Sequence, residues 1–433
     1  MFIALGVLLG LISLCPIILA VDGSILPCLI PLLVALGLIL ASIKLAPGEA
    51  QRFANLTKLF VIGAAIPAIW ILLQMLPLPL SRTQPLATIS ELAHPVWKSV
   101  SAGFRHGVNG SITVDIGATA IALVRYLSFV GVVLLATAAT INRDRAESVL
   151  VSLTAATVLI ALIAAASDLF GLGLRARDEA FDCAGIGVIL SAACAALVFE
   201  RRETRRSGKS DARFRFGALA SFVAFVICAA AIVAARSGSL IFAPSCGLVM
   251  FCAVIIVRRL DLGRWGAGAI GVTASVIAIA LVTGAAGHSS DPRLAFVKKD
   301  AASVELTQRI LADAPFLGDG AGAFEALLPI YQSTDPMAGE GEAVTAAAKL
   351  SIEMGRPMLW LAVLAATIAL LVLLRGASNR GRDSFYPAAG AACVATLLIQ
   401  AFINVGLFGS ALPVLAGVIF GLGLAQSQGR VSY

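Results

Sequence analysis

Twelve long runs of apolar residues follow one another along the chain, separated by polar segments. A helix needs about 20 apolar residues to cross the hydrocarbon core of a bilayer, so each run predicts a transmembrane helix. The predicted spans are 2–21, 26–44, 57–76, 118–140, 149–167, 183–199, 217–235, 240–257, 267–286, 357–374, 387–405 and 409–426. The pattern indicates an all-α polytopic membrane protein, in which the pair of runs around Arg236 is either two full spans or a re-entrant arrangement.

Two connections on the same side of the predicted bundle are long. The second of them divides the chain into three parts: residues 1–286, the connection itself, and residues 357–433. The first, about 77–117, lies within a region of nine spans that ends at residue 286. The second, 287–356, is the largest polar segment, and 357–433 holds the last three spans and a tail. Within the second connection, residues 301–314 show helical periodicity that Pro315 stops, which predicts a helix lying on the membrane surface or over the bundle.

Composition supports the membrane assignment and excludes several other classes. Apolar residues make up 59% of the chain and charged residues 13%, whereas soluble proteins average about 25% charged residues. The eight cysteines show no short paired spacing and the chain has three histidines, so no zinc or redox motif and no His-rich metal site is expected. We interpret the cysteines as small buried apolar residues.

The net charge of +7 is distributed unevenly between the two sides of the predicted membrane. The side that holds both termini carries 19 basic and 8 acidic residues, the opposite side carries 12 basic and 17 acidic residues, and Arg125 lies inside the fourth span. Short loops rich in Lys and Arg stay in the cytoplasm, so both termini are expected there. The basic surplus is therefore a signal of topology, and no nucleic-acid partner is expected.

Several cations occur where topology disfavours them, and each has an ordinary explanation as well as a functional one. Arg125 lies inside an apolar span, where it either faces a partner or extends its side chain toward the membrane surface. Arg236 lies at a Ser-Gly turn, where an arginine suits phosphate binding but also occurs in ordinary loops. The same choice, between an anion site and a solvated surface, applies to the cations of the large loop: Arg293, Lys298, Lys299 and Arg309.

A glycine-dense stretch follows the predicted surface helix and includes Gly318 and Gly320. It is either part of a phosphate-binding loop or a turn that returns the chain to the membrane. No strand precedes it and no Gly-Lys-Ser/Thr follows, so its likeness to a phosphate loop is weak.

In their order along the chain, these features resemble the O-antigen ligase and O-antigen polymerase family. The resemblance is carried by Trp70-Ile-Leu-Leu-Gln74-Met-Leu-Pro77-Leu-Pro79, by Ile112-Thr-Val-Asp115 leading to Arg125-Tyr126, by Arg236-Ser-Gly, and by Asp313-Ala-Pro315-Phe-Leu-Gly318-Asp-Gly320-Ala-Gly322-Ala-Phe324. It implies a fold similar to the GT-C glycosyltransferases in the bacterial inner membrane, with both long loops in the periplasm.

The resemblance also implies an activity: a metal-independent, inverting glycosyltransferase without a cofactor. Its partners would be a polyprenyl-diphosphate-linked oligosaccharide, a glycan or lipid acceptor, and membrane lipids. Arg236 and Arg293 would act on the donor diphosphate, with substrate contacts from Lys298, Lys299, Arg309, Arg125, Gly318 and Gly320. Polymerase and ligase activities both remain open.

One family feature is absent from this chain. Members often carry a His-Asn pair shortly before a Glu-x-Gly, whereas here Glu342-Ala-Val344-Thr345 precedes Glu353-Met-Gly355 without a histidine. Either Glu342 or His288 acts as the base, or the acceptor chemistry differs, or activity has been lost. A transporter or flippase of envelope glycans and a non-catalytic scaffold are the alternative functions.

Overall fold

The computed structural model describes residues 1–21, 23, 25–78, 93–103, 109–171, 174, 176–204, 211–235, 238–259, 293–294, 301–331, 343–379 and 383–428. Within these ranges, nine helices are long and apolar enough to cross a membrane. They are α1 (Phe2–Ala20), α2 (Ile25–Lys44), α3 (Pro47–Gln74), α6 (Ile116–Ala139), α7 (Arg143–Phe170), α8 (Arg177–Thr204), α9 (Asp211–Ala234), α10 (Gly238–Arg259) and α15 (Arg356–Asn379). The chain is therefore a multi-pass membrane protein.

The remaining described helices are shorter. Two of them are apolar, α16 (Phe385–Gln400) and α17 (Leu412–Ala425), and the short 3₁₀ helix η1 (Gly406–Phe408) lies between them. The others are α5 (Pro95–Gly103), α12 (Ala301–Asp313), α13 (Phe324–Tyr331) and α14 (Ala346–Met354). The surface helix predicted over 301–314 is confirmed by α12.

Eleven of the twelve predicted spans coincide with a helix, and the twelfth, 267–286, lies outside the described residues. The helices extend past the apolar windows at their polar ends, where caps satisfy the first free N–H groups. At the start of α7, for example, the Asn142 side chain accepts a hydrogen bond from the Asp144 N–H at 3.1 Å. The helix predicted over 387–405 is wrong beyond Gln400, because residues 401–411 form turns and η1.

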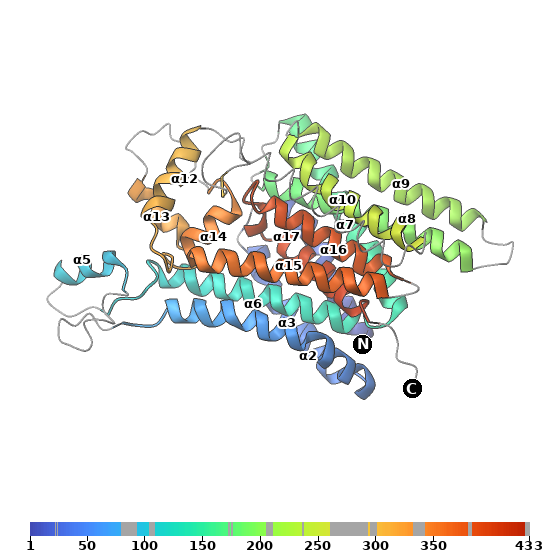
Figure 1. The fold of residues 1–433 in the computed structure, drawn as a ribbon, viewed down its shortest axis with the longest axis horizontal. Helices are drawn as coiled ribbons and strands as arrows, with labels where there is room; N and C mark the ends of the chain where they lie inside the picture. Colours follow the sequence, from blue (N-terminus) through green and yellow to red (C-terminus); the bar gives the residue numbers. More distant parts are fainter. Residues whose placement is uncertain are drawn as a thin grey trace.

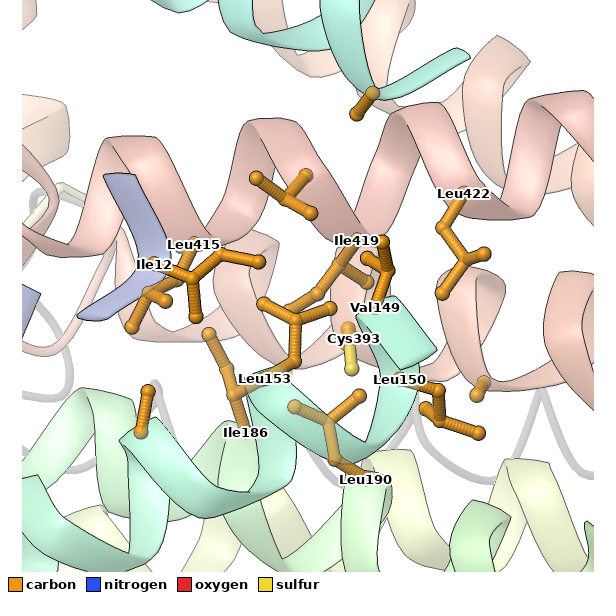
Figure 2. Packing of buried hydrophobic residues seen from close by; sticks show 14 of the residues in the cluster. Ile12, Val149, Leu150, Leu153, Ile186, Leu190, Cys393, Leu415, Ile419 and Leu422 are labelled. Carbon is orange, nitrogen blue, oxygen red and sulfur yellow. The ribbon is translucent and has the colours of Figure 1, made fainter. Parts of the chain in front are cut away.

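The centre of the bundle is a dry core formed by helices distant in sequence. Figure 2 shows side chains of α1, α7, α8, α16 and α17 meeting there, including Ile12, Leu153, Ile186, Cys393 and Leu415. Between α6 and α17 the backbones approach closely at Gly421, where a Cβ atom would lie 2.6 Å from the Val133 carbonyl oxygen. Small residues at such contacts allow the close packing that drives helix association in lipid.

The outer faces of the bundle expose large apolar side chains, as a surface facing lipid tails requires. Six of the eight cysteines are buried, but Cys28 on α2 and Cys252 on α10 are exposed. The expectation that every cysteine is buried is therefore wrong for these two, which lie on helices with apolar outer faces.

The two ends of the bundle differ in structure and charge. The helices α5, α12, α13 and α14 gather at one end, and both termini lie toward the other (Figure 1). The end with the termini is rich in arginines that are paired with acids. Arg143 contacts Asp383 at 2.9 Å, Arg145 contacts Glu49 at 2.8 Å, and Arg201 pairs with Glu147.

Candidate functional site

The helices at the end opposite the termini form a compact extramembrane unit, which we call the cap. It consists of α12, α13 and α14 together with residues 109–115, 293–294, 314–323 and 343–345, and α5 adjoins it through His94 (Figure 1). It has an apolar core of its own, which includes Leu294, Ile310, Phe324, Val344 and Ile352. The cap is thus a packed structure able to hold polar groups in fixed positions at the end of the bundle.

A glycine-rich turn at residues 318–322 of the cap packs against the short segment between α14 and α15. Gly318, Gly320 and Gly322 all have positive φ angles, which side chains with a Cβ rarely adopt. A Cβ atom on Gly318 would lie 2.5 Å from both the Glu353 carbonyl oxygen and the Gly355 nitrogen. The Gly318 N–H donates to the Pro315 carbonyl at 3.0 Å and the Gly320 N–H to the Glu353 carbonyl at 2.9 Å. Both N–H groups are therefore occupied within the protein, and contact of these glycines with substrate stays a prediction.

Gln74, at the end of α3, holds this turn with its side chain. Its Nε2 atom donates to the carbonyl oxygens of Glu353 at 3.2 Å and Leu317 at 3.4 Å, and its Oε1 atom accepts from the Ala321 N–H at 3.1 Å. The side chain is fully buried. Gln74 thus satisfies backbone groups of two cap segments and holds both of them on the end of α3.

His94 and Asp319 link the first long connection to the second. The His94 Nε2 atom lies 3.2 Å from Asp319 Oδ1, and its Nδ1 atom accepts a hydrogen bond from the Val96 N–H at 3.2 Å. Both ring nitrogens are thus occupied, one at the start of α5 and one at the glycine-rich turn. This arrangement positions α5 against the glycine-rich turn.

Lys349 and Glu353 form a second polar pair on α14. Their charged groups are 4.0 Å apart, and the Lys349 ammonium also faces the rings of Phe324 and Phe408, at 5.8 and 5.1 Å from the centroids. Burial raises the pKa of the Glu353 carboxyl above its ordinary value, and this is only partly offset by Lys349 and by N–H groups at the start of α13. Glu353 therefore anchors α13 on α14 from a poorly solvated position.

Among the predicted site residues, Arg236, Lys298, Lys299 and Glu342 lie outside the described residues, as does the alternative base His288. Arg293 is half-buried beside the cap, and its carbonyl oxygen accepts a hydrogen bond from Thr345 Oγ1 at 2.9 Å. Arg309 lies on the exposed face of α12, where it pairs with Glu305 of the same helix at 2.5 Å. In this structure the Arg309 guanidinium therefore forms an exposed ion pair within its own helix.

Arg125 occupies a different position, where the underside of the cap meets the membrane helices. Its neighbours on α6, Ala122 and Tyr126, pack in a cluster with Ala321 of the glycine-rich turn and with Met354 at the end of α14. In the same cluster, the Trp70 Nε1 atom donates to the Met354 carbonyl at 3.2 Å. This cluster is therefore the contact between the cap and the membrane helices α3 and α6.

The Arg125 side chain itself points outward from the bundle. It is exposed on α6, beside the exposed apolar side chains of Ile121 and Val124. Within the described part of the chain, no acidic side chain pairs with Arg125 and no hydrogen bond is formed by its guanidinium. The structure thus places a cation on the outer face of an apolar helix, with no anion beside it among the described residues.

Sequence reasoning did not single out His94, Asp319, Lys349 or Gln74 as parts of one structure, because their contacts join segments far apart in the chain. It also missed Glu179 and Asp182, which precede the apolar run predicted at 183–199 and were counted with the loop. Their spacing places both on one face of the first turns of a helix, and this pattern could have identified them.

Comparison with models of known protein families and with characterised proteins found no match for this chain.

Proposed function

We propose that this protein transfers or polymerises oligosaccharide from a polyprenyl-diphosphate donor, at the membrane face that carries the cap. The observation that carries the proposal is Arg125, an exposed cation on the outer face of an apolar helix near the cap. An arginine in the apolar region costs about 2.5–3.5 kcal/mol on insertion scales, so its place there calls for an anionic group or water. A lipid-linked diphosphate would bring such a group to this face.

The guanidinium is suited to this ligand in geometry as well as charge. It presents a planar fork of donors that matches phosphate oxygens in pairs. On α6 the side chain is tilted toward the N-terminus of the helix, which is the end that carries the cap. The polyprenyl tail would lie along the apolar faces of the helices, and the glycan would extend toward the cap.

The proposed reaction is a displacement at the anomeric carbon of the donor sugar. An acceptor hydroxyl loses its proton to a base, for which Glu342 is the candidate, and its oxygen forms the new glycosidic bond. The bond from the anomeric carbon to the phosphate oxygen breaks, and its electron pair leaves with the lipid diphosphate. Cations such as Arg236 and Arg293 would stabilise this leaving group, a contribution that often dominates catalysis.

The charge distribution supports an orientation for this reaction. Arginines gather at the end with the termini, which favours a cytoplasmic location for that end. The cap would then face the periplasm of a bacterial inner membrane, where lipid-linked glycans are presented for transfer.

The test is donor use by purified full-length protein, comparing the wild type with Arg125→Ala and Arg125→Lys. Loss of one charge-assisted interaction, about 1.5–3 kcal/mol, should raise the KM for lipid-linked oligosaccharide roughly tenfold to a hundredfold. Lysine should restore part of this affinity. Arg375→Ala is the matched control, since Arg375 is exposed on α15 near the opposite end. An unchanged KM in Arg125→Ala would refute the assignment.

Transport of the lipid-linked glycan is the second candidate function, and one observation favours it. Two acids of α8, Glu179 and Asp182, are buried within the bundle, and buried acids in membrane helices often belong to ion or substrate pathways. Vesicles containing the protein distinguish the two functions: a carrier moves intact donor to the other leaflet, whereas a transferase consumes it.

A further inference from the structure

A buried acidic site lies beneath the cap, where residues 401–411 cover the start of α8. Glu179 and Asp182 point at this loop from α8, and their side chains are 5% and 0% exposed. The loop fits closely around them, because a Cβ atom on Gly406 would overlap Asp182 Oδ2 and one on Gly409 would overlap the Glu179 carboxylate. The two acids are therefore enclosed by protein.

Nothing in the described surroundings neutralises these acids. The covering elements α16, η1 and α17 belong to a stretch, residues 384–429, that contains no charged residue. On α8 itself, Arg177 pairs with Asp168 at 2.8 Å. The other titratable groups near the two acids are Asp178 and Cys183 on α8 and Cys15 on α1, none of which supplies positive charge. Buried charges in proteins are normally paired or neutralised, so a positive charge is missing here.

The two acids differ in how they are accommodated. The Glu179 Oε1 atom accepts hydrogen bonds from the N–H groups of Ala411 at 2.6 Å and Leu412 at 2.8 Å, at the N-terminus of α17. A helix N-terminus stabilises a carboxylate in this way. Asp182 receives less: its Oδ1 atom accepts from the Asn404 amide at 2.8 Å, while its Oδ2 atom is buried without a hydrogen-bond partner. The missing positive charge therefore belongs at Asp182 Oδ2.

A second buried oxygen without a hydrogen-bond donor lies at the interface between α8 and α16. Gln400 is 1% exposed, and its Oε1 atom has no hydrogen-bond partner. Its amide lies against Gly185, one turn along α8 from Asp182, because a Cβ atom there would be 3.0 Å from Gln400 Nε2. Asn404, which binds Asp182, follows Gln400 by one turn. The Asp182 carboxylate and the Gln400 amide thus lie about one turn apart along α8, and each has a buried oxygen without a donor.

We infer that Asp182 and Gln400 bind a small monovalent cation, either Na⁺ or a proton, that supplies the missing positive charge. The close contact of Gly406 with Asp182 Oδ2 leaves no room for an organic ligand, so only an ion or a proton fits there. Oxygen ligands of this kind suit a hard cation. A proton on Asp182 Oδ2 would equally supply the positive charge, by converting the carboxylate into a neutral acid.

The site is connected to the cap through the backbone of its covering loop. The N–H groups of Ala346 and Ala347, which open α14, donate to the carbonyl oxygens of Asn404 and Ala401, each at 2.8 Å. Asn404 therefore binds Asp182 through its side chain and α14 through its carbonyl. Occupation of the site should stabilise both the loop and the cap, whatever reaction the protein carries out.

The experiment is thermal unfolding of the purified full-length protein in detergent, in two series. In the first, Na⁺ replaces choline at constant ionic strength and pH; in the second, pH is varied without Na⁺. A Na⁺ site predicts an unfolding midpoint that rises by about 2–4 °C for each tenfold increase in Na⁺ above its Kd. A proton site predicts no response to Na⁺ and a midpoint that rises as pH falls more steeply than in Asp182→Asn, since the raised pKa of Glu353 gives both proteins the same additional pH dependence.

Two variants and a control assign the response to the site. Asp182→Asn and Gln400→Met should each abolish or weaken the response, and Gln400→Met retains the volume of the side chain if Asp182→Asn fails to fold. Asp115→Asn should keep it, since an exposed aspartate at a helix N-cap is replaced there by another good cap. The inference is overturned if the wild type responds to neither ion, or if both site variants respond as the wild type does.

Discussion

At the scale of single residues, the junction between the cap and the bundle depends on buried polar side chains with complete sets of partners. Gln74 is the main example, because it satisfies two carbonyl oxygens and one N–H group from segments more than 240 positions away in sequence. The sequence shows only a glutamine at the end of an apolar run, Trp70-Ile-Leu-Leu-Gln74. Its role could not be predicted, because partners so distant in the chain are fixed by the fold.

Replacing Gln74 with leucine should destabilise the protein strongly. The change leaves buried backbone groups without partners, and each such group costs on the order of 1–3 kcal/mol. We expect a clear fall in the unfolding midpoint measured by thermal denaturation in detergent. Gln51→Leu is the control, since Gln51 is exposed on the same helix. Equal midpoints for the two variants would show that the Gln74 contacts contribute little.

Glu353 should make stability depend on pH. Burial raises the pKa of its carboxyl in the folded state, so the folded protein binds the proton more tightly than the unfolded chain does. Its contribution is complete below the ordinary glutamate pKa and is lost as pH rises through the raised value. As pH rises from the ordinary to the raised pKa, the wild type should therefore lose stability relative to Glu353→Gln. The expected loss is up to tenfold in the folding equilibrium constant per pH unit.

This pH dependence is measured by chemical denaturation of the wild type and Glu353→Gln across the acidic range. Glu305→Gln serves as the control, because Glu305 is exposed on α12. A stability difference between the wild type and Glu353→Gln that stays constant with pH would contradict the assignment.

At the scale of elements, apolar length located the membrane helices well but not their ends. The α7 helix begins at Arg143, ahead of the predicted start at 149, because Asn142 caps a polar first turn. Residues 401–405 and 409–411 were predicted as the ends of two helices because they are apolar. They instead form a loop whose N–H groups and glycines enclose Glu179 and Asp182. Hydropathy reports transfer into lipid, and it carries no information about such enclosed polar contacts.

Close contact between α6 and α17 should not tolerate even one added methyl group. In Gly421→Ala the Cβ atom would lie 2.6 Å from the Val133 carbonyl oxygen and 2.7 Å from the Ala136 Cβ. Such overpacking costs about 1–3 kcal/mol, so the thermal unfolding midpoint should fall. Gly63→Ala on α3 is the matched control, because no atom lies within 4 Å of the added carbon. Gly63→Ala should be neutral or slightly stabilising, since alanine favours helix; an equal fall in both variants would contradict this explanation.

At the scale of the whole molecule, the bundle has a basic end with the termini and an opposite end with the cap (Figure 1). The all-helical membrane architecture and the surface helix α12 followed from periodicity and length. The assembly of the cap did not, because it depends on contacts such as His94 with Asp319 that join the two long connections. Arg125 was visible in the sequence as an arginine in an apolar run, but its exposure beside the cap required the fold.

The most direct measurement of the proposed function is the fate of a lipid-linked oligosaccharide labelled in its sugar and incubated with purified wild-type protein. A second lipid-linked oligosaccharide and a lipid A core serve as alternative acceptors. We predict that the label moves to an acceptor and that one polyprenyl diphosphate is released for each transfer. Recovery of the donor intact, in either leaflet of a vesicle, would contradict it.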